Sequence, residues 1–184
     1  MSEANQILGQ IAVVRSRILE VFDTVDEPEQ LRPTADGGWS IAEIVEHLVL
    51  AEDYGIRGLW GALESARKGE SEPLPPEQSG RSIDDVFSGQ PERVDAPDAV
   101  VPRSGGQPVG YWLDRFRAHQ DAIASLAREM EQVGPERVIY PHFRVGALDG
   151  IQRLGFFRFH LDRHWRQIGR TLDRDSAGGP RQGG

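Results

Sequence analysis

Four long segments of this chain repeat apolar residues every three or four positions, which is the period of an α-helix that buries one face. The segments are residues 5–24, 41–67, 109–133 and 150–172. Turn-forming residues follow the first segment at Pro28 and the third at Gly134. No segment shows a convincing strand pattern. The chain is therefore predicted to be all-α and to fold as a four-helix bundle.

Local signals mark the helix ends and the connections. Ser40 and Glu43 have the spacing of a capping box, and Asp149 is a candidate N-cap. The stretch from 68 to 107 holds six prolines and five glycines, so it cannot form a long element, although residues 82–87 could make a short helix. This link is expected to drape over the bundle and to wall a pocket. The shorter connections favour antiparallel neighbours within the first and within the last helix pair.

Length and composition limit the classes of protein to consider. The 184 residues suit one domain over 1–173, followed by a flexible tail over 174–184. A net charge of −8 with scattered arginines argues against nucleic acid, and no apolar run is long enough for a membrane span. The N-terminus lacks the basic and apolar regions of a signal peptide. The chain has no cysteine, which excludes disulfides and a thiolate nucleophile and fits a reducing cytoplasm.

Three of the five histidines form the strongest candidate site. His160 and His164 are four residues apart, so on a helix they project about 40° from each other, one turn apart on the same face. His47 lies at the edge of the apolar stripe of the second segment and can supply a third imidazole. Such a set could hold a divalent transition metal. The same positions also suit partly buried core histidines with local hydrogen bonds, and spacing alone leaves both readings open.

Other polar residues are weaker candidates. His119, on the inner face of the third segment, is either a fourth ligand, a residue that orients one, or a packed core histidine. Gln167 could orient a ligand or be an exposed helical residue, and Glu43 could reach the cavity near His47 or serve only as a cap. His142 is expected at the surface or at a pocket rim. No serine triad, phosphate loop or dinucleotide fingerprint is present, so the catalytic residue is unknown.

Two motifs resemble the DinB/YfiT-like superfamily. Gly38-Trp39-Ser40-Ile41-x-Glu43-Ile-x-x-His47-Leu48 resembles the motif of its second helix. Tyr140-Pro141, then Gly146, then His160-x-x-x-His164-Trp-x-Gln167-Ile168 resembles the motif of its fourth helix. The resemblance spans nearly the whole chain, and the combination of three histidines is its most specific part.

The resemblance implies an up-down-down-up bundle with a long Pro/Gly-rich link between the second and third helices, often as a homodimer. It also implies a divalent metal, usually nickel or zinc, at His47, His160 and His164. Characterised members include transferases and isomerases that use low-molecular-weight thiols such as mycothiol or bacillithiol, and others are classed as metal-dependent hydrolases. Without a cysteine, the chain would take its thiol from an external cofactor or small-molecule substrate. The alternative is a non-catalytic or stress-associated protein in which the metal staples the bundle.

Overall fold

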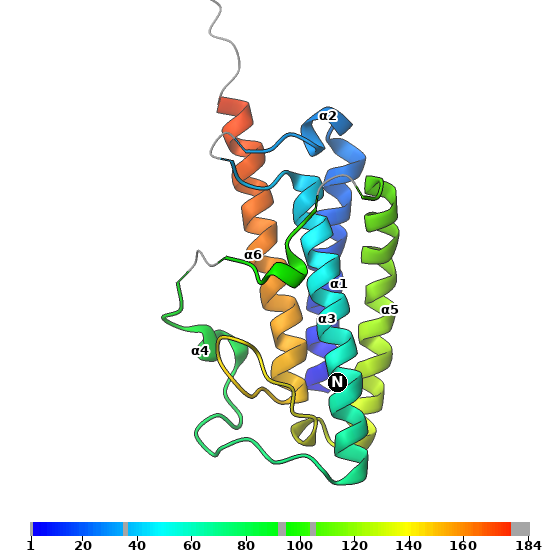
Figure 1. Ribbon diagram of the computed structural model, residues 1–184, viewed down its shortest axis with the longest axis vertical. Helices are drawn as coiled ribbons and strands as arrows, with labels where there is room; N and C mark the ends of the chain where they lie inside the picture. The colour runs from blue at the N-terminus through cyan, green and yellow to red at the C-terminus, as the bar shows by residue number, and fades with distance from the viewer. Residues whose placement is uncertain (1, 35–36, 92–94, 104–105, 178–184) are drawn as a thin grey trace, which may run out of the picture.

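Four long helices form the frame of the protein. The structure, a computed structural model, describes residues 2–34, 37–91, 95–103 and 106–177, with side chains as far as residue 172. The long helices are α1 (Glu3–Thr24), α3 (Ile41–Lys68), α5 (Val109–Val133) and α6 (Gly150–Ala177). Helices α1 and α6 run one way and α3 and α5 the other, so the order is up-down-down-up (Figure 1). This confirms the predicted all-α bundle; in the part of the chain that the structure describes, one isolated bridge, His142 to Gly146, is the only β pairing.

Local sequence explains where the helices begin and end. The Ser40 hydroxyl accepts from the Glu43 amide, and the Glu43 carboxylate accepts from the Ser40 amide, which is the predicted capping box at the start of α3. Asp149 and Gln152 make the same reciprocal pair at the start of α6. Gly69 ends α3 in the left-handed region, with φ 74°. Helix α6 continues to Ala177, and residues 178–184 of the predicted tail lie outside the described residues.

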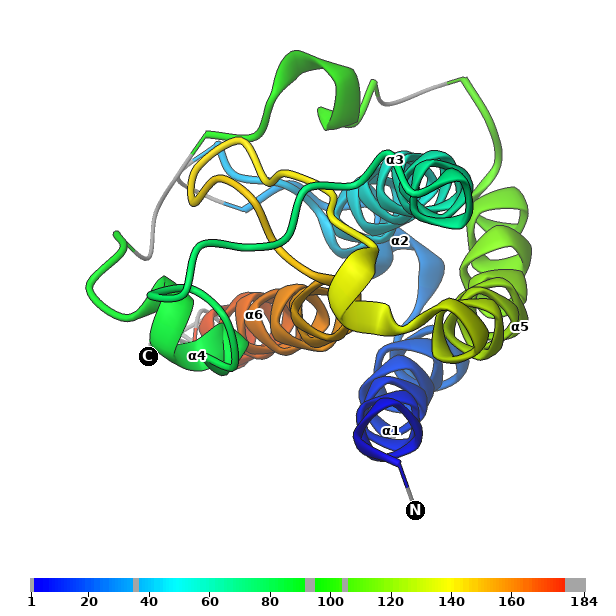
Figure 2. The same cartoon turned by 90° about the horizontal axis from the view of Figure 1, so that it is seen from below.

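The four helices pack around one apolar core. The most extensive packing joins the parallel pairs, α1 with α6 and α3 with α5. Seen from below, the consecutive helices α1 and α3 stand at opposite corners, as do α5 and α6 (Figure 2). The prediction that consecutive helices would be direct neighbours is therefore wrong, although they do run antiparallel. Among the described residues, no helix is long and apolar enough to cross a membrane.

The two connections that span these diagonals each contain a short helix. The first includes α2 (Glu27–Gln30) and the second includes η2 (Pro135–Arg137). Pro28 lies in the first turn of α2, where its missing N–H is not needed. The proline that marks the end of the first helix in the sequence therefore also begins a new short helix.

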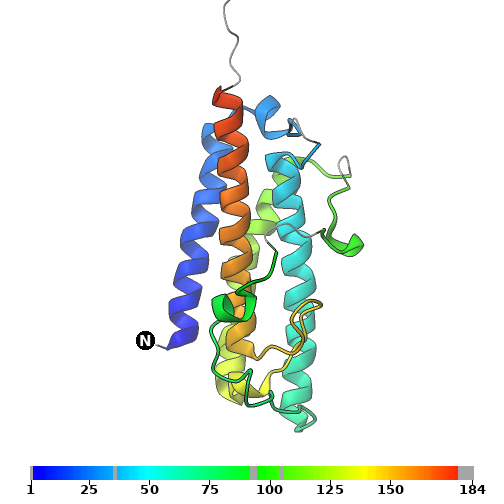
Figure 3. The same ribbon diagram turned by 90° about the vertical axis from the view of Figure 1, so that its left-hand side faces the viewer.

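The link between α3 and α5 lies along the side of the bundle formed by α3 and α6 (Figure 3). It contains α4 (Ile83–Phe87), the short helix predicted there, and η1 (Asp98–Val100). Helix α4 packs on α6, while η1 packs on α3. A Cβ added at Gly155 would lie 3.2 Å from Ile83, so this glycine lets α4 approach α6 closely. The link is thus anchored on both helices that carry the candidate histidines.

Candidate metal centre

His47 of α3 and His160 and His164 of α6 bring their Nε2 atoms together. The Nε2 of His160 lies 3.2 Å from that of His47 and 3.1 Å from that of His164. One ligand atom from each of the three residues lies within 4.8 Å of the other two. Helix α6 presents its two histidines one turn apart on a single face, and α3 packs beside that face. The structure therefore brings together the three residues that the sequence singled out.

Hydrogen bonds hold two of these rings by their other nitrogen. His47 Nδ1 donates to the Val100 carbonyl oxygen at 2.8 Å. His164 Nδ1 donates to the Gln167 side-chain oxygen at 2.9 Å. Because these oxygens only accept, Nδ1 carries the proton in both rings and Nε2 presents a lone pair. Gln167 thus orients His164, and Val100 of the link orients His47.

This placement of protons shows that the three residues fit a metal ion. The Nε2 of His160 faces two lone pairs, and a neutral imidazole can donate one proton to only one of them. In at least one of the two close Nε2–Nε2 contacts, two nitrogen lone pairs therefore point at each other, which is unfavourable unless a cation lies between the two nitrogens. Three imidazole nitrogens are an established donor set for zinc and similar divalent ions.

Burial keeps the three imidazoles neutral near pH 7. It lowers the pKa of His47, and together with the nearby His47 it lowers the pKa of His164 to about 3. Burial, followed by the neighbouring His164 and His47, holds the pKa of His160 well below its usual value. The neutral ring is the form that binds a metal.

A cavity of about 460 Å³ adjoins the three histidines. Its walls come from α3, α6, the link between residues 95 and 100, and the loop over residues 140–144. The apolar lining includes Phe87, Phe143, Phe156, Phe157 and Phe159. The ring of Phe156 stacks on that of His160, with 5.5 Å between centroids. Trp39 packs on His47 at 4.8 Å between centroids, so aromatic rings cover two of the three imidazoles.

Several polar residues of the cavity were missed by the sequence analysis. Arg153 lines it, as do Tyr54 and Tyr140. Arg153 was not singled out from the sequence, although its position two turns before His160 on the same face was an available signal. His142, expected at the surface or at a rim, is buried in the cavity wall, where burial lowers its pKa to about 4.

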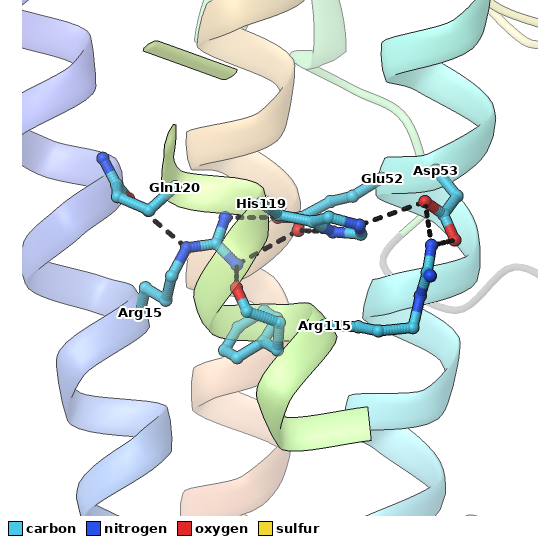
Figure 4. Close-up of polar contacts among 7 residues, drawn as sticks. Arg15, Glu52, Asp53, Arg115, His119 and Gln120 are labelled. Atoms are coloured by element: carbon cyan, nitrogen blue, oxygen red, sulfur yellow. Dashed lines mark hydrogen bonds and ion pairs between the residues drawn. The ribbon is translucent and has the colours of Figure 1, made fainter. Parts of the chain in front are cut away.

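His119 and Glu43 lie elsewhere. His119 Nδ1 is 2.8 Å from a Glu52 carboxylate oxygen and its Nε2 is 3.1 Å from one of Asp53 (Figure 4). His119 is not among the described residues that line the cavity, so it is neither a fourth ligand nor an orienting residue of the three-histidine cluster. The Glu43 carboxylate serves the cap of α3, which was the second of its two possible roles.

The residues around His119 form a buried polar network that joins three helices. Arg15 of α1 makes two bonds to the Glu52 carboxylate of α3, at 2.8 and 3.1 Å (Figure 4). Arg15 also donates to the Phe116 carbonyl of α5 at 2.6 Å. Arg15 and Glu52 are 3% and 1% exposed, so this is a desolvated, paired charge. The network fixes how α1, α3 and α5 sit against each other.

Comparison with known proteins gives two matches. A family model of the DinB superfamily matches residues 10–168. Among solved structures, the chain is similar to one titled "Crystal structure of TT2238, a four-helix bundle protein", with 20% sequence identity and a TM-score of 0.57. The alignment covers 91% of this chain and 98% of that one, and at this identity the likeness concerns the fold alone. No curated protein matches the chain.

Proposed function

This chain belongs to the DinB superfamily, and we propose that it is an enzyme in which His47, His160 and His164 hold one divalent transition metal ion. The observation that carries the proposal is the meeting of three Nε2 lone-pair positions beside a largely apolar cavity. Nickel and zinc are the ions we expect, in line with the family resemblance. The substrate is a small molecule that enters the cavity.

The residues around the three histidines have different roles. Val100 and Gln167 keep the proton on Nδ1 of His47 and His164, which leaves each Nε2 available for binding. Phe156 and Trp39 pack on the rings of His160 and His47 and help to hold them in place. A bound ion would supply Lewis acidity and would lower the pKa of an incoming thiol or water molecule. Three protein ligands are fewer than such ions usually take, which leaves room for a substrate.

The reaction types that we propose are a thiol-dependent transfer or a hydrolysis. Because the chain has no cysteine, a thiol would come from a low-molecular-weight cofactor. The alternative is a non-catalytic protein in which the ion only staples α3 to α6. The adjoining cavity favours the enzyme, since a staple has no need of one.

Replacing His160 with alanine tests the metal. We expect the untagged wild-type protein to hold one divalent ion per chain by elemental analysis and His160→Ala to hold almost none. Chelation should lower the melting temperature of the wild type, because the ion binds only the folded state, and should leave His160→Ala unchanged. His119→Gln is the matched control and should keep its ion, since His119 lies in the other polar cluster. A full ion content in His160→Ala would contradict the assignment.

Cobalt(II) distinguishes the enzyme from the staple. When the cobalt-loaded protein is mixed with a low-molecular-weight thiol, a sulfur-to-metal charge-transfer band should appear if the ion has an open position. An unchanged spectrum at saturating thiol, with cobalt shown to be bound, would favour the staple.

A further inference from the structure

Arg153 of α6 is a buried cation that lacks an acidic partner in the described part of the chain. It is 5% exposed, and its Nε has no hydrogen-bond partner. The neighbouring groups that favour its protonated form are the hydroxyls of Tyr140 and Tyr54, which are neutral near pH 7, rather than a carboxylate. Arg15 is buried to the same degree, yet it is paired with Glu52. An unpaired buried charge is costly, so the isolation of Arg153 calls for a physical reason.

Aromatic rings hold the Arg153 guanidinium in place. Its central carbon lies 4.4 Å from the ring centroid of Tyr140 and 5.5 Å from that of Phe156. Gly55 of α3 makes room for the Phe157 ring of the cavity wall, because a Cβ there would lie 2.9 Å from that ring. Rings that cover a guanidinium leave its in-plane N–H groups available for an acceptor. Burial lowers the pKa of Arg153 to about 10, so the group stays charged at neutral pH.

Arg153 and the three histidines share one cavity. Arg153 precedes His160 by two helical turns on the same face, which is about 10 Å along the axis. Phe156 lies between them and lines the same cavity. The cavity therefore offers a fixed positive charge, then an apolar wall, then the imidazole cluster.

We propose that Arg153 binds a carboxylate group of the ligand, and that the substrate is an elongated, largely apolar monoanion whose other end reaches the histidines. The second half of this inference rests on the proposed function of the metal centre, whereas the carboxylate anchor does not. A guanidinium presents two parallel N–H groups that match a carboxylate. One carboxylate balances the guanidinium of Arg153, which is the buried one among the three arginines that line the cavity, whereas a phosphate monoester dianion carries a second charge that Arg153 alone does not balance.

Calorimetric binding of phenylbutanoate and of its uncharged amide, phenylbutanamide, tests the anchor. Chelator-treated protein is used, so that the carboxylate cannot bind a metal instead. The wild type should bind the carboxylate about tenfold or more tightly than the amide, because hydrogen bonds between charged groups are the strong ones. Arg153→Gln should lose this preference and keep its affinity for the amide.

Two further variants serve as controls. Arg158→Gln changes an arginine of the same helix that pairs with Asp84 and Asp162 and does not line the cavity, so it should keep the preference. Arg153→Lys keeps the charge but not the two parallel donors, and should keep part of the preference. If Arg153→Gln does not fold, Arg153→Lys is used as the test variant in its place.

The outcomes separate this inference from the metal centre. Equal affinity of the wild type for the two compounds, including no measurable binding of either, contradicts the anchor, and so does a preference that survives Arg153→Gln. A preference seen only in metal-loaded protein, lost in His160→Ala and kept in Arg153→Gln, would place the carboxylate on the ion; it would overturn the anchor and support the metal centre. Tighter binding of phenylpropyl phosphate than of phenylbutanoate would overturn the choice of carboxylate. A preference in metal-free protein that depends on Arg153 supports the anchor even if no ion is ever taken up.

Discussion

Single residues of α3 decide how closely the aromatic wall of the cavity can approach. A Cβ added at Gly58 would lie 2.0 Å from the ring of Tyr140, which no real contact allows. A Cβ at Gly61, one turn on, would meet nothing within 4 Å. Tyr140 can therefore lie against α3 only because position 58 has no side chain. Burial, and then a hydrogen bond with Tyr54, raise the pKa of Tyr140 in this position.

Alanine at these two glycines should have opposite effects. Gly58→Ala forces Tyr140 to move and should lower the free energy of unfolding by about 1–3 kcal/mol. Gly61→Ala should raise it by about 0.5–1 kcal/mol, because alanine is the better residue inside a helix. Urea denaturation of both variants measures the difference. Equal gains in stability from the two changes would show that Tyr140 does not pack on α3 as described.

At this scale the sequence could name the histidines but not the residues that complete their surroundings. His160 and His164 are found by spacing within one helix, and His47 by its place on an apolar stripe. The Val100 carbonyl is 53 residues from His47 along the chain, and no local period connects them. Arg153 lies two turns before His160 on the same face of α6, but only the folded loop with Tyr140 shows that it is covered.

Among the helices, α3 has two polar faces with different roles. One face carries His47 toward α6, and the other carries Glu52 and Asp53 toward α5. Burial alone would raise the pKa of Glu52, but Arg15 and His119 together bring it below its usual value. A carboxylate with a lowered pKa stabilises the fold above its unfolded pKa of about 4.3, and that contribution is lost as the pH falls through the folded value.

Replacing Glu52 with glutamine tests the network. At pH 7 we expect Glu52→Gln to lose about 3–5 kcal/mol of unfolding free energy, because Arg15 is left buried without its partner. The variant should also lose less additional stability than the wild type as the pH falls below about 4.3, since it lacks the titrating group. Glu64→Gln, in an exposed pair on the same helix, should change stability by less than about 1 kcal/mol. Urea titrations at several pH values measure both; similar losses in the two variants would contradict a structural role for the network.

Most bounds of the long helices followed from the sequence because their signals are local; the exception is the end of α6, which continues to Ala177 instead of stopping near residue 172. The capping box at Ser40 and the glycines after α3 and α5 lie within a few residues of the ends that they define. The short helices α2, η1 and η2 were not predicted. Each has three or four residues, too few for an apolar period to appear, and they form because the connections lie against the bundle.

In the whole molecule, the diagonal placement of consecutive helices could not be read from the sequence. Loop length limits which helices can be joined, but connections as long as these can reach either a neighbouring helix or the one at the opposite corner. The Pro/Gly-rich link forms part of the cavity wall, as the sequence predicted. Asp95, Ala96, Pro97, Ala99 and Val100 do line the cavity.

We further propose that the protein is a homodimer in solution, which rests on its membership of the superfamily. Light scattering at micromolar concentration should give twice the chain mass of 20.5 kDa. His160→Ala should keep that mass, because the three histidines lie within one chain. A monomer mass for the wild type over the whole concentration range would contradict the dimer.

The histidines lie on helices, whereas part of the cavity wall lies on connections. This arrangement affects how such proteins can acquire new substrates. The three imidazoles stand on α3 and α6, whose other faces build the core, so mutation there threatens folding. Residues 95–97 and 141–144 shape the cavity from connections that stand apart from that core. Because loops tolerate exchange far better than packed helices do, a lineage can change what the cavity admits while every intermediate sequence still folds and keeps its histidine cluster. Selection can thus explore specificity by neutral steps in two connections, separately from the chemistry at the histidines.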